Sequence, residues 1–503
     1  MNPTTIKLHP NDNVAVAVKT LPAGSEAGSP GVTTKAPVPA GHKVAQARID
    51  IDQPIRKYNQ IIGFASKTIL PGQHVHSHNV TLRDFERDYA FGKDVKIPEE
   101  VEQQATFEGF LRPDGRAGTR NYIGVLTSVN CSATVAKYIG AAFDKEGETD
   151  LGNLDGVVAF THGTGCGMNQ GNGLALLRRT MAGYAAHPNL AAVLVVGLGC
   201  EVNQIPDWLK EAGLEAGPQL RTMVIQESGG TRKTVERGVS MVREMIPDFK
   251  SIQRQTVPAS HLTLGLECGG SDAYSGITAN PSLGAAADLL VRHGGTAILS
   301  ETPEIYGAEH LLTRRAVSEK VGRKIVDLIQ WWEDYTMRNK AEMNNNPSPG
   351  NKAGGLTTIL EKSLGAVAKG GTSPLQQVYQ YAETVTSKGF VFMDSPGYDP
   401  VSVTGQVAAG ANVVCFTTGR GSVFGCKPAP SLKLATNSTM YRHIEEDMDV
   451  NCGEVLDGGK SVQQMGEEIF QLILDTASGK PSKSEAQGFG DHEFLPWQMG
   501  AVM

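Results

Sequence analysis

The sequence predicts a small β domain followed by a larger α/β body with mostly parallel sheets. From Asn121 onward, apolar runs of strand length alternate with glycine-rich turns and helical segments, an order typical of parallel α/β domains. Before about residue 80, the apolar stretches are short and alternating, as in Val14 to Val18, and a Gly/Pro-rich loop interrupts them. Glycine supplies 58 of the 503 residues, and we assign this surplus to loops.

A length of 503 residues suits two to four domains. The charged run from Arg83 to Glu102, with Pro98 inside it, is typical of a linker. We therefore expect a β domain at residues 1–82, a linker at 83–105, a first α/β domain at 106–255 and a second at 256–503.

Individual elements of the α/β body follow from the same patterns. We expect strands at residues 121–128, 155–162, 191–198, 221–226, 261–266, 295–300, 390–394 and 411–417. Apolar residues at helical spacing predict helices at 318–335 and 461–478. Ser461 and Gln464 form a capping box for the second helix, and Gly479 marks its end.

Composition excludes several classes of protein. Lys and Arg number 46 against 53 Asp and Glu, and this net charge of −7 argues against a nucleic-acid binder. The sequence contains no apolar run of membrane-spanning length and no signal-peptide pattern at its start, so we expect a cytoplasmic protein without a membrane partner. Seven widely spaced cysteines do not resemble a disulfide framework.

Four cysteines follow predicted strands directly: Cys131, Cys166, Cys200 and Cys268. Ligands of open α/β sheets bind at the carboxyl ends of strands, so a metal site assembled from these loops is one interpretation, and buried packing is the other. The absence of any C-x-x-C pair excludes a zinc ribbon or a thioredoxin-type motif. His162 lies four residues before Cys166, where imidazole and thiolate suit Fe(II), Mn(II) or Zn(II), although a hydrogen-bonding role is the alternative. We take His162, Cys166, Cys200 and Cys268 as the candidate metal ligands.

Three histidines, His74, His76 and His78, recur at every second position near the end of the β domain. On a strand this spacing points all three side chains to one face. An imidazole there can donate a hydrogen bond, supply a proton or bind a metal. The alternative is an exposed polar strand edge.

Two glycine-rich loops each carry a cation. Residues 346–355 form a backbone-rich loop containing Lys352 that suits an anion, and a plain surface turn is the alternative. Arg420, in a Thr-Gly-Arg-Gly loop after a predicted strand, can hold a carboxylate, or can form a surface ion pair. Arg120, with Arg112 and Arg116, adds positive charge before the first main strand, or belongs to a solvated face.

Several segments together resemble the altronate and galactarate dehydratase family across nearly the whole chain. The segments that carry the resemblance are residues 107–110, 118–121, 197–201, 268–272, 275–281, 346–355 and 418–421. The first 80 or so residues resemble the small β-clip domain, called SAF, of that family. The expected fold is therefore an α/β body preceded by a SAF-like β-clip domain.

The resemblance implies a hydro-lyase that removes water from a six-carbon sugar acid to give a 2-keto-3-deoxy acid, activated by Fe(II) or Mn(II). It leaves open whether the cysteines hold a single ion or an iron–sulfur cluster. The candidate catalytic residues are His76, His78, His162, Asp272 and Lys352. The candidate substrate-binding residues are Arg120, Asn280, Asn351 and Arg420. The expected partner is a small sugar acid, and we expect a homo-oligomer.

The choice of substrate within the family rests on local segments. Residues 74–79 and 301–309 resemble the altronate branch, whereas residues 107–110 and 273–276 resemble the galactarate branch. We expect altronate, with galactarate as the alternative. Two further alternatives are a lyase that removes sulfite from a sulfonated hydroxy acid and a non-catalytic sugar-acid sensor. The presence together of His76, Cys166, Cys268, Asp272 and Arg420 favours catalysis over sensing.

Overall fold

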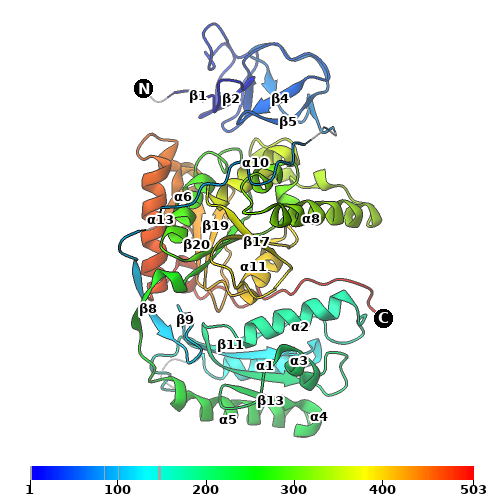
Figure 1. Cartoon of the computed structure of the whole chain (residues 1–503), viewed down its shortest axis with the longest axis vertical. Coiled ribbons are helices and arrows are strands. Elements are labelled where there is room, and N and C mark those ends of the chain that lie inside the picture. Colours follow the sequence, from blue (N-terminus) through cyan, green and yellow to red (C-terminus); the bar gives the residue numbers. More distant parts are fainter. Residues whose placement is uncertain (1–2, 84, 86, 100, 145–148) are drawn as a thin grey trace.

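A computed structural model describes residues 3–83, 85, 87–99, 101–144 and 149–503. It divides into three parts stacked along the longest axis of the molecule (Figure 1). The N-terminal β domain is at one end, a seven-stranded sheet with its helices lies in the middle, and a four-stranded sheet with its helices is at the other end. The predicted fold class is confirmed. Residues 84, 86 and 100 of the expected linker lie outside the described residues.

The N-terminal β domain consists of two small antiparallel sheets. One contains β1 (Thr5–Ile6), β2 (Val14–Ala17), β3 (Lys43–Ala45) and β6 (His74–Val75), and the other contains β4 (Pro54–Lys57), β5 (Gln60–Ala65) and β7 (Val80–Thr81). Buried isoleucines such as Ile55 and Ile62 join its interior to the apolar core of the seven-stranded sheet. The β domain is therefore packed against the body.

The four-stranded sheet is parallel, in the order β11-β10-β12-β13. Its strands are β10 (Tyr122–Thr127), β11 (Gly156–Phe160), β12 (Leu190–Gly197) and β13 (Leu220–Val224). Helices α1 (Ala133–Ala141) and α5 (Thr231–Phe249) cover one face, and α2 (Asn172–Ala185) and α3 (Ile205–Ala212) cover the other. A small antiparallel sheet of β8 (Thr106–Leu111), β9 (Ala117–Gly118) and β14 (Gln255–Pro258) connects this part to the next.

The seven-stranded sheet is also parallel, in the order β17-β18-β16-β15-β19-β20-β21. Its strands are β15 (Thr263–Cys268), β16 (Thr296–Leu299), β17 (Leu375–Tyr379), β18 (Gly389–Met393), β19 (Val413–Thr418), β20 (Ser431–Ala435) and β21 (Val450–Asn451). Helices α6 (Ala279–Arg292) and α13 (Val462–Ala477) pack together on one side, and α11 (Asp399–Ala408) packs against α2 on the other. The remaining α-helices are α4 (Ile225–Ser228), α7 (His310–Thr313), α8 (Glu319–Arg338), α9 (Pro349–Ala353), α10 (Ile359–Val367), α12 (Ser438–His443) and α14 (Lys483–Ala486). None of the described helices is both long and apolar enough to span a membrane.

The expected elements of the body are confirmed. Each of the eight expected strands forms, with ends within two residues of the expected ones. The capping box of α13 is present, with Ser461 accepting from the Gln464 amide and Gln464 accepting from the Ser461 amide. The sequence patterns missed β17, β20 and β21. Strand β20 carries a buried lysine, Lys433, at its centre. The ammonium group of Lys433 donates to the carbonyl of Phe424, which compensates for its burial.

One buried carboxylate ties the β domain to the body. Glu361, on α10, accepts hydrogen bonds from the ammonium groups of Lys43 at 2.8 Å and Lys57 at 3.0 Å, and all three side chains are buried. Burial alone raises the pKa of Glu361, but the two lysines lower it to about 2. Burial, followed by the charge of the neighbouring Lys57, lowers the pKa of Lys43 to about 8, although Glu361 opposes the decrease.

We predict that Glu361→Gln loosens the β domain, because it leaves two buried ammonium groups without a counter-charge, a change that typically costs ~3–5 kcal/mol. The variant should melt at a lower temperature than the unsubstituted protein. Trypsin should also cleave it faster within the linker, residues 83–105. The folded pKa of Glu361 is below its ordinary 4.5, so the carboxylate stabilises the fold above about pH 4.5, and this stabilisation is lost as the pH falls toward 2. Glu319→Gln, which removes an exposed pair with Arg323, is the matched control. Equal cleavage of both variants would contradict the role of Glu361.

Candidate active site

The carboxyl ends of the seven parallel strands meet at one edge, which the N-terminal β domain contacts. In open α/β sheets this edge is where ligands bind. The Tyr274 hydroxyl, in the loop after β15, donates to the carbonyls of Ala17 and Val18, and Lys43 donates to the carbonyl of Gly355. Polar residues from the body and from the β domain therefore meet along this edge.

The loop after β15 is built around the buried carboxylate of Asp272. Asp272 accepts from the amide and hydroxyl of Ser275 and from the Thr436 hydroxyl at 2.9 Å. Burial raises the pKa of Asp272, although these hydrogen bonds oppose the increase. A Cβ at Gly419 would lie 2.1 Å from the Asp272 carboxyl carbon, so only glycine fits there. The next residue, Arg420, is exposed and lies against Gly270.

Helix α9 lies against the same loop. Asn351 donates to the carbonyl of Ser271 at 2.8 Å, and the amide of Ala273 donates to the carbonyl of Gly354 at 2.9 Å. Lys352, half-buried, belongs to this helix. Four residues singled out in the sequence are thus brought to one place: Asp272, Asn351, Lys352 and Arg420.

Behind this loop is a buried charge cluster, consisting of Glu267, Cys268, Glu301, Glu304, Lys362 and Lys369. Lys369 pairs with Glu301 and Lys362 with Glu304, each at 2.6 Å. The Cys268 thiol contacts Glu304 at 3.4 Å. Two lysines therefore balance two carboxylates.

Glu267 in this cluster and Asp399 beside it both have raised pKa values. Burial and the nearby Glu301 raise the pKa of Glu267 well above its ordinary value. Burial, Glu301 and Glu304 also raise the pKa of half-buried Asp399, to about 7. Asp399 lies against Gly269 at the sheet edge, so it is a carboxyl group able to exchange a proton near neutral pH. The sequence analysis missed Asp399, although its place in Pro-Gly-Tyr-Asp-Pro after a predicted strand was a usable signal.

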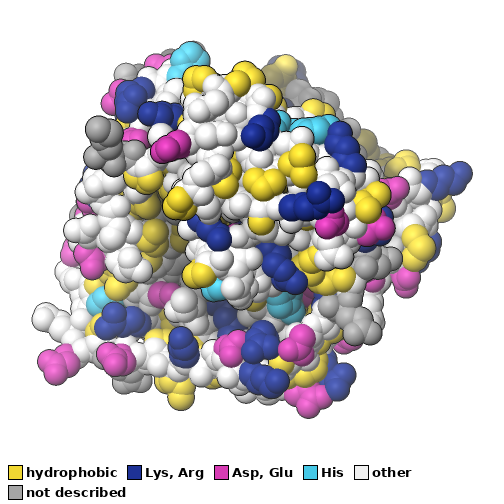
Figure 2. All heavy atoms as spheres, turned by 90° about the horizontal axis from the view of Figure 1, so that it is seen from above, with side chains coloured by type: hydrophobic (Ala, Val, Ile, Leu, Met, Phe, Trp, Pro, Cys, Tyr) yellow, Lys and Arg dark blue, Asp and Glu magenta, His cyan; other side chains and the backbone are white. Residues whose placement is uncertain are grey.

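A histidine group, His42, His74 and His76, lies in the β domain beside α9. His42 Nδ1 is 2.9 Å from His74 Nε2, and its other ring nitrogen is 3.2 Å from the carbonyl oxygen of Ala353. Only His74 belongs to a strand, and a turn held by Asn79 carries His76 and His78, so the alternating-strand explanation is wrong. The rings of His74, His76 and His78 still gather, although His78 is exposed. Figure 2, a view onto this end of the molecule, shows histidines among basic and acidic side chains.

The histidine group suits a divalent metal better than the charge cluster does. Its three ligand atoms lie within 4.8 Å of one another, and Nδ1 of His76 has no hydrogen-bond partner. Burial lowers the pKa of His74 to about 4 and of His76 to about 3, so both are neutral at pH 7, as metal binding requires. Cys268, Glu301 and Glu304 are equally close together, but Lys362 and Lys369 already neutralise their carboxylates. His42, which sequence reasoning missed, was signalled only by its place beside Lys43 before β3.

The other residues predicted for the site lie elsewhere. His162, Cys166 and Cys200 lie in loops that follow strands of the four-stranded sheet, whereas Cys268 ends a strand of the seven-stranded one, so the four do not form one group. His162 is buried, with one ring nitrogen 2.9 Å from the Thr127 carbonyl oxygen and the other accepting from the amide of Thr164.

Arg120 and Asn280 have structural partners. Arg120 pairs with Glu485 at 2.7 Å and donates to the carbonyls of Thr119 and Thr476. Asn280 donates to the carbonyl of Gly365 and accepts from the hydroxyl of Thr417. Both side chains therefore join segments of the protein.

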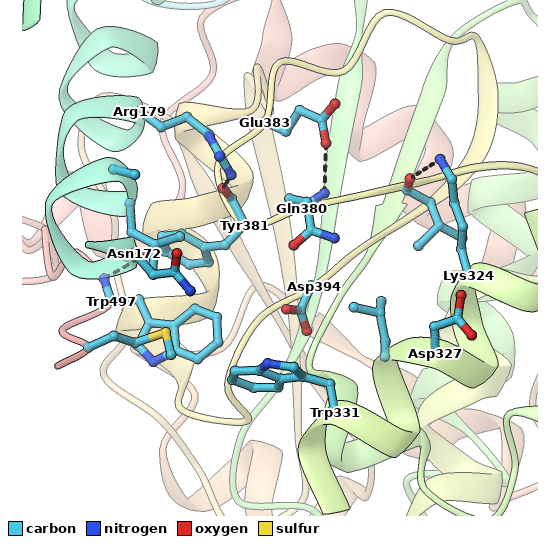
Figure 3. Close-up of a pocket in the computed structure, with 15 residues that line it drawn as sticks. Asn172, Arg179, Lys324, Asp327, Trp331, Gln380, Tyr381, Glu383, Asp394 and Trp497 are labelled. Atoms are coloured by element: carbon cyan, nitrogen blue, oxygen red, sulfur yellow. Dashed lines mark hydrogen bonds between the residues drawn. The ribbon is translucent and has the colours of Figure 1, made fainter. Parts of the chain in front are cut away.

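A separate cavity lies between α2, α8 and the C-terminal segment (Figure 3). Trp331, Trp497 and Tyr381 supply aromatic surface, but its cations already have partners: Arg179 donates to the Tyr381 carbonyl and Lys324 to the Val378 carbonyl. No residue predicted for the site lines this cavity. It is therefore a weaker candidate for an acidic substrate than the sheet edge.

Three family models match successive parts of the chain. The altronate/galactarate dehydratase SAF domain matches residues 3–83, the second domain of D-galactarate dehydratase/altronate hydrolase matches residues 109–250, and the D-galactarate/altronate dehydratase C-terminal domain matches residues 259–502. An altronate dehydratase of Bacillus subtilis is 36% identical over 96% of this chain and 97% of its own length. A galactarate dehydratase (L-threo-forming) of Escherichia coli is 36% identical over 97% of this chain and 95% of its own length.

A third relative catalyses a different elimination. The (2R)-sulfolactate sulfo-lyase subunit beta of Chromohalobacter salexigens is 32% identical over 78% of this chain and 96% of its own length. The matches to all three domain models, together with the two nearly full-length dehydratases, decide the class of the protein. The chain is a hydro-lyase and belongs to the altronate/galactarate dehydratase family.

We predict that Asp399→Asn reduces kcat/KM for dehydration by ~10²–10⁴, because it removes a group able to exchange a proton at neutral pH. In the unmodified enzyme, kcat/KM should rise as the pH increases through about 7, where the carboxylate form of Asp399 becomes dominant. Steady-state rates between pH 5 and 9 measure both effects. Asp334→Asn, on the exposed surface of α8, is the control. An unaltered pH profile in Asp399→Asn would contradict this role.

Proposed function

We propose that the protein dehydrates a six-carbon sugar acid, preferably altronate, to a 2-keto-3-deoxy acid with the help of a divalent metal. The observation that carries the proposal is the meeting of Asp272, Lys352 and Arg420 with Asp399 at the sheet edge, beside the histidine group. The dehydratases from Bacillus subtilis and Escherichia coli support the reaction class.

The chemistry explains why these residue types are needed. A base removes the proton from C2 of the acid, the hydroxyl on C3 leaves as water after accepting a proton, and the resulting enol becomes the 2-keto product. Negative charge grows on the substrate carboxylate as the C2 proton leaves, so nearby cations stabilise the transition state. We assign carboxylate binding to Arg420 and Lys352, and proton removal to Asp399.

The histidine group is the proposed metal site. Fe(II) and Mn(II) accept neutral imidazole ligands, and His42, His74 and His76 supply three. When bound, the ion would supply Lewis-acid assistance to departure of the hydroxyl group. His78, exposed beside this group, is proposed to contact the substrate rather than the ion. We also propose that the enzyme is a homo-oligomer.

The reaction class is tested by incubating the protein anaerobically with Fe(II) or Mn(II) and a panel of aldonic and aldaric acids. We predict an α-keto acid product from altronate, detected by semicarbazide absorbance and mass spectrometry. Product from galactarate alone would select the galactarate alternative. Sulfite release from sulfolactate would select the activity of the Chromohalobacter relative. Binding without turnover of any panel member would indicate a sensor and would overturn the proposal.

We predict that His76→Ala lowers bound metal and kcat/KM together, the latter by at least ~10-fold, because a site with few protein ligands has none to spare. Metal content by mass spectrometry and activity should fall while the melting temperature of metal-free protein stays close to that of the parent. The control is His492→Ala, which replaces an exposed histidine near the C-terminus. His78→Ala should reduce activity but retain the metal. Full metal content in His76→Ala would place the ion elsewhere.

A further inference from the structure

The three exposed cysteines of the chain all lie at one edge of the four-stranded sheet. Cys131, Cys166 and Cys200 are exposed. The other four are buried in the C-terminal domain: Cys268, Cys415, Cys426 and Cys452. Free cysteine is among the most buried residue types, so three exposed thiols at one edge need an explanation. The proposed dehydration does not use them.

The strand order brings the three thiols to neighbouring loops. Cys131 follows β10, Cys166 follows β11 and Cys200 follows β12, and β10 pairs in parallel with both of the other strands. The carboxyl ends of these strands therefore point the same way. All three cysteines come from adjacent positions at one sheet edge.

Hydrogen bonds connect the three loops to one another. The amide of Asn130, next to Cys131, donates to the carbonyl of Thr164 at 2.9 Å. Asn203 lies three residues after Cys200. Its backbone N–H donates to the carbonyl of Gly165 at 3.1 Å, and its side-chain amide donates to the carbonyl of Ser128 at 3.0 Å. The residues that carry the thiols are thus fixed relative to each other.

Glycines and one acid hold these loops in shape. Gly165 has a φ of +98°, and a Cβ there would lie 2.3 Å from the carbonyl oxygen of Ser128. Glu201, 4% exposed, accepts from the Ser128 hydroxyl at 2.5 Å and from the amide of Gly199 at 2.6 Å. This carboxylate folds the Cys200 loop back onto the Cys131 loop.

The supply of one thiol by each of three separate loops suits a cluster better than a single ion. Ligands of one ion must all approach one point, whereas in an iron–sulfur cluster each thiolate binds a different iron. Three thiolates leave one iron of a [4Fe–4S] cluster without a cysteine ligand.

We propose that Cys131, Cys166 and Cys200 bind a [4Fe–4S] cluster at the carboxyl edge of the four-stranded sheet. This site is distinct from the histidine group and goes beyond the proposed dehydration, because it does not depend on which acid is the substrate. The cluster has one iron open to a ligand other than cysteine.

The full chain, purified without oxygen and reconstituted with ferrous iron, sulfide and dithiothreitol, tests the proposal. We expect about four irons and four acid-labile sulfides per chain, with broad absorbance near 400 nm. Each of Cys131→Ser, Cys166→Ser and Cys200→Ser should lose most of this absorbance, and Cys452→Ala should keep it. Alkylation of the unsubstituted chain is a second measurement, which does not depend on the folding of a variant. Iodoacetamide should label the three exposed cysteines only after the cluster is removed with a chelator.

Four outcomes overturn the proposal: iron without sulfide, zinc in place of iron, normal cluster content in all three serine variants, and equal labelling before and after chelation. Failure here and failure of the proposed dehydration are distinguishable. Sugar-acid turnover by chain that contains divalent metal but no acid-labile sulfide would leave dehydration standing and remove the cluster.

Discussion

Parallel strand direction is the constraint on which the rest of this structure depends. In the seven-stranded sheet every strand ends at the same edge, so loops that begin at Gly269, Ser300 and Gly419 meet although they are far apart in the sequence. The four-stranded sheet obeys the same rule on a smaller scale and brings Cys131, Cys166 and Cys200 together. Antiparallel strands would divide these loops between two edges. Each sheet thus concentrates its reactive side chains at one boundary.

Burial of charge is acceptable in the charge cluster because its lysines pair with carboxylates. Lys369 and Glu301 form one pair, and Lys362 and Glu304 form another. Removal of one partner from such a pair typically costs ~3–5 kcal/mol, since the remaining charge is left without solvent. Lys362 and Lys369 lower the pKa of Glu304, whereas burial and Glu304 raise the pKa of Glu301 against the effect of Lys369. Both carboxyl groups in turn raise the pKa of the neighbouring Asp399. Structural ion pairs and the proposed acid–base group are parts of one electrostatic system.

Sequence patterns identified the architecture more fully than the site. Periodicity and the Ser461 capping box predicted strands and helices accurately, because local backbone preferences and one-sided burial determine them. Arg420 and Asp272 were predicted from glycine-rich loops after strands, and their roles remain predictions. Asp399 and His42 were missed, because their significance comes from neighbours distant in the sequence, Glu301 and His74 respectively. His162 was predicted as a metal ligand from its spacing to Cys166. Its ring nitrogens instead have partners at Thr127 and Thr164, which sequence spacing does not reveal.

The junction at Glu361 has a consequence for how firmly the β domain must be bound to the body. The β domain and the body belong to one chain, so their association is intramolecular, and a short tether gives an effective concentration on the order of millimolar. A junction of this kind needs far less intrinsic affinity than two separate proteins would need to remain together. The ion pairs of Lys43 and Lys57 with Glu361 therefore have to fix only where the β domain sits on the body, because the chain connection already keeps the two together.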